Sequence, residues 1–118
     1  MKKPKGQCAK WSDTQVAQWI KFLVSQGRVA FDDAGHAERR SEQRLTSYEE
    51  MLTCVKRGLA GGRESGVMPT GKPSILEERM TFQHRFASRP QQVTHVVAAI
   101  SDAYEDCVLI TIIQKRKR

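Results

Sequence analysis

The spacing of apolar residues in the first quarter of the chain predicts an amphipathic helix. Apolar side chains recur at intervals of three and four between Val16 and Val24, which is the spacing of one helical face. Ser12 and Gln15 have the spacing of a capping box, and Gly27 is well placed to end a helix. We therefore predict a helix that begins after Ser12, ends before Gly27 and packs one face against a core.

A second helical stripe runs from Tyr48 to Val55, and Gly58 is expected to close it. Its start has two alternatives one residue apart, because capping-box spacings begin at both Thr46 and Ser47. The N-terminal half of the chain therefore carries two amphipathic helices, separated by a strongly polar segment.

The C-terminal half carries three strand patterns. Residues 80–86 alternate between apolar and polar side chains, whereas 93–100 and 107–113 are almost continuously apolar, as in central strands. The short acidic connection at 101–106 predicts that the last two strands form an antiparallel hairpin. Residues 28–31 form a short strand or an extended lead-in. These elements predict an α+β fold, with N-terminal helices packed on a small antiparallel sheet of three to four strands.

A stretch rich in glycine and proline, residues 60–78, separates the helices from these strands. A connection of this length inside a compact domain is functional, mobile or conceals a strand. Val67 and Met68 are the best candidates for such a hidden strand.

The positive charge is concentrated at the two ends of the chain. Twenty Lys and Arg against 13 Asp and Glu give a formal net charge of +7. Three N-terminal lysines and the run from Lys115 to Arg118 account for this excess, so the body between them is formally neutral. We predict a disordered basic tail at 1–10, a single domain at 11–114 and a basic tail at 115–118. Such tails either add sequence-independent affinity for nucleic acid or only solubilise the chain.

Cysteine usage and hydropathy exclude several classes of protein. Cys8, Cys54 and Cys107 are dispersed, and Cys54 and Cys107 fall in apolar patterns that predict core positions. No stretch has the length of a membrane span, and no secretory signal follows the basic start. The histidines lack the spacing of metal ligands, so we expect no metal or other cofactor. The sequence therefore predicts a reduced, cytoplasmic protein without membrane contact.

The candidate chemistry lies in the polar run HAERRSEQR, residues 36–44. His36, Arg40 and Arg44 recur every four residues, so on a helix they stand along one stripe. An imidazole and two guanidiniums can hold a phosphate and move a proton beside it. The alternative interpretation is a solvated helix face whose charges pair with neighbouring carboxylates.

The order of these residues resembles the DUF4258 family of small bacterial proteins. The family pattern is close to HAxxRMxERGI with a later strand reading VITV, and the matching positions here are His36, Ala37, Arg40, Arg44 and Thr111. Ser41, Gln43 and Leu45 depart from the pattern. The family is linked by similarity to the RelE and barnase-like ribonuclease toxins, which fold as helices followed by a curved antiparallel sheet. The resemblance therefore implies a RelE/barnase-like fold and an RNA-cleaving or RNA-binding role.

RNA cleavage without a metal needs a base for the 2′-OH, a cation for the phosphorane and an acid for the leaving oxygen. His36 has the titration range of such an acid or base, and Arg40 and Arg44 can bind the phosphate. His84 is the candidate second proton carrier, although a histidine on the apolar side of a strand is more often a hydrogen-bonded core residue than a catalyst. Thr111 either offers its hydroxyl to substrate or satisfies a neighbouring group.

Three functions agree with these patterns. The first is a small cytoplasmic RNase-like protein of toxin type, with the stripe as its active site and an antitoxin partner that covers it. The second is a non-catalytic module of the same fold, such as a regulator or inhibitor from a mobile element, that binds RNA, another nucleic acid or a protein. The absence of a certain second acid or base favours this alternative. The third is an adaptor that binds protein through residues 60–78.

Overall fold

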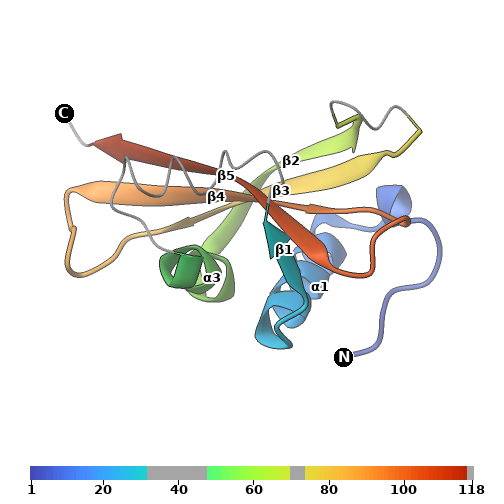
Figure 1. Ribbon diagram of the computed structural model, residues 1–118, viewed down its shortest axis with the longest axis horizontal. Helices are drawn as coiled ribbons and strands as arrows, with labels where there is room; N and C mark the ends of the chain where they lie inside the picture. Colours follow the sequence, from blue (N-terminus) through green and yellow to red (C-terminus); the bar gives the residue numbers. More distant parts are fainter. Residues whose placement is uncertain (32–47, 70–73, 117–118) are drawn as a thin grey trace.

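The computed structural model describes residues 1–31, 48–69 and 74–116 and shows an α+β fold (Figure 1). Its elements, in chain order, are η1 Cys8–Lys10, α1 Asp13–Ser25, β1 Val29–Phe31, α3 Tyr48–Arg57, β2 Leu59–Val67, β3 Glu77–His84, β4 Gln92–Ile100 and β5 Cys107–Arg116. The helices α1 and α3 lie on the same side of the sheet, as predicted. None of the described helices is both long enough and apolar enough to cross a membrane.

The five strands form one sheet in the order β1-β5-β4-β3-β2. The strands β2 to β5 pair antiparallel with their neighbours, and the predicted β4–β5 hairpin is confirmed. The short strand β1 pairs parallel with β5. The sheet prediction is therefore corrected on two points: the described residues form five strands where three to four were expected, and the sheet is mixed where it was expected to be antiparallel.

The strand that sequence analysis did not place is β2. It covers Leu59 to Val67, whereas the hidden strand was expected at Val67 and Met68. Most of β2 is exposed because it is an edge strand, so it needs no alternating apolar residues. Its pairing with β3 is irregular beside Gly62 and Gly66, whose φ angles of 66° and 65° lie in the region that glycine adopts most readily.

The helix α1 has both of the predicted end signals. The backbone N–H of Gln15 donates to Ser12 Oγ at 3.1 Å, and Ser12 N–H donates to Gln15 Oε1 at 2.9 Å. At the other end Gly27 has a φ of 71°, and the N–H of Arg28 donates to the Leu23 carbonyl at 2.9 Å. These are the capping box and the glycine stop that the sequence predicted.

We expect the variant Ser12→Ala to lose about 1 kcal/mol of unfolding free energy, because it removes the side-chain acceptor of the capping box. Urea titration followed by circular dichroism measures this loss. The matched control is Gln18→Ala, which changes an exposed residue of α1 and is expected to leave the stability nearly unchanged. Equal losses in both variants would contradict a role for the cap.

The hydrophobic core lies between the two helices and the sheet. Its fully buried members include Ile20 and Leu23 of α1, Met51 and Cys54 of α3, and Phe82 of β3. The predicted core positions of Cys54 and Cys107 are confirmed, and burial raises the pKa of each thiol to about 12. Both thiols therefore stay protonated and unreactive at neutral pH.

The first residues of the chain contribute to this core. Cys8 and Trp11 are each only 4% exposed, and residues from Cys8 to Lys10 form the short 3-10 helix η1. The N–H of Cys8 donates to Asp102 Oδ1 at 3.1 Å, between β4 and β5. The folded body therefore begins within the segment that sequence analysis assigned to a disordered tail at 1–10.

The junction between α3 and β2 is tightly packed around Gly58. A Cβ at this position would lie 2.1 Å from the Cys54 carbonyl oxygen and 2.5 Å from the Gln83 carbonyl oxygen. Lys21 of α1 reaches the same junction and donates through Nζ to the carbonyls of Val55, Lys56 and Gly58 at 2.8, 3.1 and 2.8 Å. Gly58 ends α3, as predicted, and close packing against β3 accounts for the glycine.

Candidate functional site

The predicted stripe of His36, Arg40 and Arg44 lies outside the described residues, within 32–47. The structure describes the residues on either side of this segment. Phe31, the last residue of β1, contacts Tyr48, the first residue of α3, with ring centroids 4.0 Å apart. The two residues that flank the stripe-bearing segment in the chain, Phe31 and Tyr48, are therefore in contact with each other.

His84 is the last residue of β3 and is half-buried. Its ring meets Phe86 edge to face, with centroids 4.7 Å apart and planes at 87°. The guanidinium of Arg89 lies over the Phe86 ring, 5.1 Å from its centroid. Arg89 Nη2 then binds Glu50 Oε2 at 2.6 Å, in the first turn of α3. We call these four residues the His84 corner.

The His84 corner carries a partly desolvated cation. The side chain of Arg89 is 23% exposed, and its Nε is buried without a hydrogen-bond partner among the described residues. Arg85, beside His84, donates through Nη1 to the Pro90 carbonyl at 2.6 Å and so holds the β3–β4 turn. A buried guanidinium N–H without a hydrogen-bond partner among the described residues costs stability.

Thr111 is not brought to the His84 corner. In register it pairs with Val97 of β4, whereas His84 pairs with Thr94. The two β4 positions are three residues apart, and successive positions of a strand alternate between the faces of a sheet. The backbone positions of His84 and Thr111 therefore belong to opposite faces, so the structure does not group these two predicted site residues.

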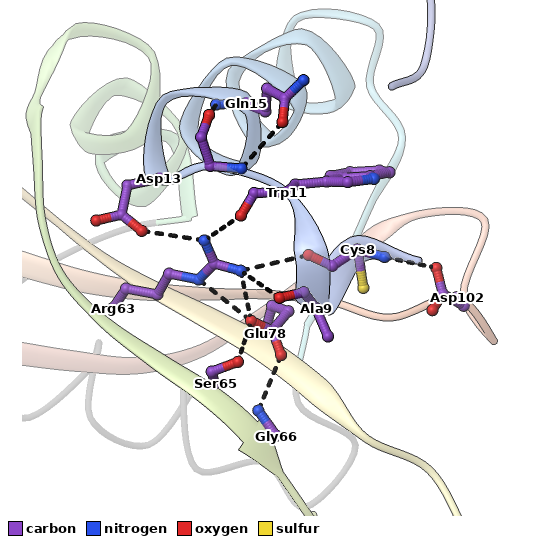
Figure 2. A network of polar contacts seen from close by, with 11 residues as sticks. Cys8, Ala9, Trp11, Asp13, Gln15, Arg63, Ser65, Gly66, Glu78 and Asp102 are labelled. Carbon is purple, nitrogen blue, oxygen red and sulfur yellow. Dashed lines mark hydrogen bonds and ion pairs between the residues drawn. The ribbon is translucent and has the colours of Figure 1, made fainter. Parts of the chain in front are cut away.

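Sequence analysis missed a polar network centred on Arg63 of β2 (Figure 2). Its guanidinium donates to the Trp11 carbonyl at 2.6 Å, to Asp13 Oδ1 at 3.0 Å and to Glu78 Oε1 at 2.7 Å. It also donates to the carbonyls of Cys8 and Ala9. Arg63 thereby ties the sheet to the chain that leads into α1.

Glu78 is the buried partner in this network, with 1% of its side chain exposed. Besides Arg63, it accepts hydrogen bonds from Ser65 Oγ at 2.6 Å and from the Gly66 N–H at 2.8 Å (Figure 2). Burial alone raises the pKa of this carboxyl, but the hydrogen bonds and the Arg63 charge outweigh burial and leave the pKa below its ordinary value.

The lowered pKa of Glu78 predicts a loss of stability in acid. The ionised carboxylate stabilises the fold fully above the ordinary pKa of 4.5, and this stabilisation is lost as pH falls through the lowered native value. We expect the unfolding free energy of the native chain to fall from neutral pH to about pH 3 more steeply than that of Glu78→Gln. Urea titrations across this range measure both slopes. Parallel slopes would contradict the prediction, and Glu64→Gln, at an exposed β2 position, is the control that keeps the native slope.

A second buried carboxylate, Glu77, accepts from Tyr104 Oη and from Arg79 Nη2, the latter at 2.9 Å. Burial, followed by the hydrogen bond to Glu77, raises the pKa of the Tyr104 hydroxyl. Sequence analysis began this strand, β3, at Met80 and left both acids in the connection at 60–78. The signal that could have identified these acids as buried is the presence of arginine partners. Arg63, the partner of Glu78, lies in a glycine-rich stretch, and Arg79, the partner of Glu77, lies two residues after it.

Among the described residues, no group of three or more His, Cys, Asp or Glu side chains is placed to hold a metal ion. Comparison with known proteins finds no matching family model, no matching curated protein and no matching solved structure. The resemblance drawn from the HAxxR pattern therefore stays a prediction.

Proposed function

We propose that this chain is an RNA-cleaving protein of toxin type, whose site combines the stripe at 36–44 with the His84 corner. The contact chain from His84 through Phe86 and Arg89 to Glu50 carries this proposal. Glu50 lies two residues after Tyr48, where the stripe-bearing segment ends. The chain of contacts thus runs from the second candidate histidine to the first turn of α3, the helix that follows the stripe-bearing segment in the chain.

The chemistry of the combined site follows from its side chains. His36 and His84 supply two imidazoles, one proposed as base and one as acid. Arg40 and Arg44 hold the phosphate and stabilise the charge that develops on it.

A relationship to the RelE and barnase-like toxins is part of this proposal. It is supported by one layer of helices on a mainly antiparallel sheet, with most strands following the helices in the chain. A toxin of this type acts on RNA in the cytoplasm and is held inactive by a protein antitoxin that covers the site.

The test is incubation of the purified chain with labelled single-stranded RNA in EDTA, beside His36→Ala, Arg40→Ala and His84→Gln. We expect multiple-turnover cleavage by the native chain, and a fall of about 100-fold or more in each histidine variant, as for loss of a general acid or base. Melting temperatures within a few degrees of the native value are expected, and the matched charge control, Lys56→Ala at an exposed α3 position, keeps its activity. Turnover that survives in folded His36→Ala would overturn the proposal.

A non-catalytic RNA-binding module is the second candidate. Two observations favour it: Thr111 lies away from the His84 corner, and the charge of Arg89 is already balanced by Glu50. In the same assay this candidate predicts saturable, salt-sensitive binding without product, weakened by Arg40→Ala and unaffected by Lys56→Ala.

A further inference from the structure

The basic run at the C-terminal end of the sequence begins inside the sheet. The last strand, β5, continues to Arg116. Lys115 pairs with Val93 of β4, and Arg116 pairs with Gln92. The first two cations of the run therefore have backbone positions in the sheet, at the end where β4 begins (Figure 1).

The strand register places Lys115 and Arg116 on opposite faces of the sheet. Arg116 pairs with Gln92, which lies two residues before the β4 partner of His84. Positions two residues apart on a strand share a face, so Arg116 belongs to the same face as His84. This is the face on which Phe82, two residues before His84, packs into the core beneath the helices. Lys115 belongs to the other face.

The turn between β3 and β4 connects the His84 corner to the β4 partner of Arg116. The N–H of Arg89 donates to the Phe86 carbonyl at 3.0 Å, and the N–H of Gln92 donates to the Arg89 carbonyl at 3.1 Å. With strands about 4.8 Å apart and about 3.4 Å per residue along each strand, the Cα atoms of His84 and Arg116 lie about 12 Å apart. A short stretch of single-stranded RNA spans that separation.

The charge at this end of the sheet favours a polyanion. Residues 79–101 and 107–118 contain no Asp or Glu, and the acids of the β4–β5 hairpin lie in its connection, at the opposite end (Figure 1). Within the His84 corner, Arg89 binds Glu50 at 2.6 Å, so its charge is already balanced. A phosphate at the corner therefore needs a further cation, and Arg116 is the cation that β5 places on that face.

We infer that Arg116 binds a phosphate of the RNA backbone beside the His84 corner, whereas Lys115 lies on the face away from the RNA. The inference rests on the proposed RNA site and adds a binding residue to it. An arginine suits this role, because its guanidinium can bind a phosphate through two parallel hydrogen bonds. The strand register carries the assignment, so two adjacent cations of equal charge are expected to differ in their contribution to binding.

The test measures binding of the full chain to labelled single-stranded 2′-O-methyl RNA, which is not cleaved because a methoxy group replaces the 2′-OH nucleophile. Fluorescence anisotropy at several salt concentrations gives the dissociation constant and its salt dependence. We expect Arg116→Gln to raise the dissociation constant about five-fold or more and to lower the salt slope by about 0.7, the value for one phosphate contact to a single strand.

The matched control is Lys115→Gln, which removes the same charge one residue away. It is expected to change the dissociation constant less than about two-fold, because salt screens a charge on the far face. Arg116→Lys keeps the charge at its position and is expected to keep the native salt slope. This variant separates loss of a phosphate contact from misfolding.

Cleavage of unmodified RNA by the same variants separates this inference from the proposed function. We expect Arg116→Gln to raise KM with little change in kcat, because a phosphate contact away from the reacting bond stabilises the bound substrate and the transition state alike. Binding without cleavage, with Arg116→Gln weaker than Lys115→Gln, would support the inference and overturn the catalytic proposal. Equal binding by Arg116→Gln and Lys115→Gln would overturn the inference even if the native chain cleaves RNA. Absence of RNA binding by the native chain would overturn both.

Discussion

Replacing Arg63 with alanine is expected to lower the unfolding free energy by about 3–5 kcal/mol, the usual cost of breaking a buried ion pair from one side. The substitution leaves the carboxylate of Glu78, 1% exposed, without its cation. It also removes the donor to the carbonyls of Trp11, Cys8 and Ala9, so the contact between the sheet and the start of α1 is lost. Urea unfolding at neutral pH measures the effect.

The control for this variant is Glu64→Ala, the next residue of β2, which is exposed and is expected to change stability little. A double variant, Arg63→Met with Glu78→Leu, removes both charges and is expected to recover part of the loss, because no uncompensated charge remains buried. A loss in Arg63→Ala as small as that of Glu64→Ala would show that the network contributes little to stability.

Replacing Gly58 with alanine is expected to lower the unfolding free energy by about 3 kcal/mol or more. This loss is at or above the largest that is typical when an extra methyl group is forced into a packed core. The added Cβ would lie 2.1 Å from the Cys54 carbonyl oxygen and 2.5 Å from that of Gln83. Both obstacles are backbone atoms, one in α3 itself and one in β3, so relief requires the chain at the end of α3 to change its backbone conformation and to move away from β3. Thermal and urea unfolding measure the cost.

Gly61→Ala is the matched control for Gly58→Ala, because the two glycines lie three residues apart but a Cβ at Gly61 meets nothing within 4 Å. This variant is expected to keep or slightly raise the stability, since alanine restricts the unfolded chain more than glycine does. Equal stability of the two variants would contradict the packing described at the α3–β2 junction.

Local sequence signals predicted those parts of the fold that depend on neighbouring residues. The ends of α1 followed from Ser12, Gln15 and Gly27, because helix caps are short-range patterns. The β4–β5 hairpin followed from two apolar runs joined by a short acidic connection. These elements could be predicted because caps and apolar runs are visible in residues that lie close together in the sequence.

The elements that sequence analysis missed depend on contacts between distant residues. The strand β2 is exposed and glycine-rich, so its backbone pairing with β3 produces no apolar alternation. The buried Glu78 requires Arg63, 15 residues earlier, and the parallel pairing of β1 with β5 joins Val29 to Cys107. No local pattern specifies such pairs.

The candidate site likewise combines features that local sequence patterns predicted with contacts between distant residues that they did not. The sequence placed His84 on the apolar side of a strand, and the structure finds it half-buried against Phe86. Sequence analysis could not predict that Arg89 contacts both Phe86 and Glu50, because this link joins the β3–β4 connection to the distant helix α3. His36, Arg40 and Arg44 remain predictions from spacing, since they lie outside the described residues.

The central claim is that the stripe at 36–44 and the His84 corner form one RNA site. Photochemical crosslinking of the native chain to 4-thiouridine-labelled single-stranded RNA, with the modified peptides identified by mass spectrometry, tests it most directly. The account predicts crosslinks in both 36–44 and 84–89 that disappear together in the variant Arg40→Ala. Crosslinks confined to the basic ends of the chain, or found in only one of the two segments, would contradict it.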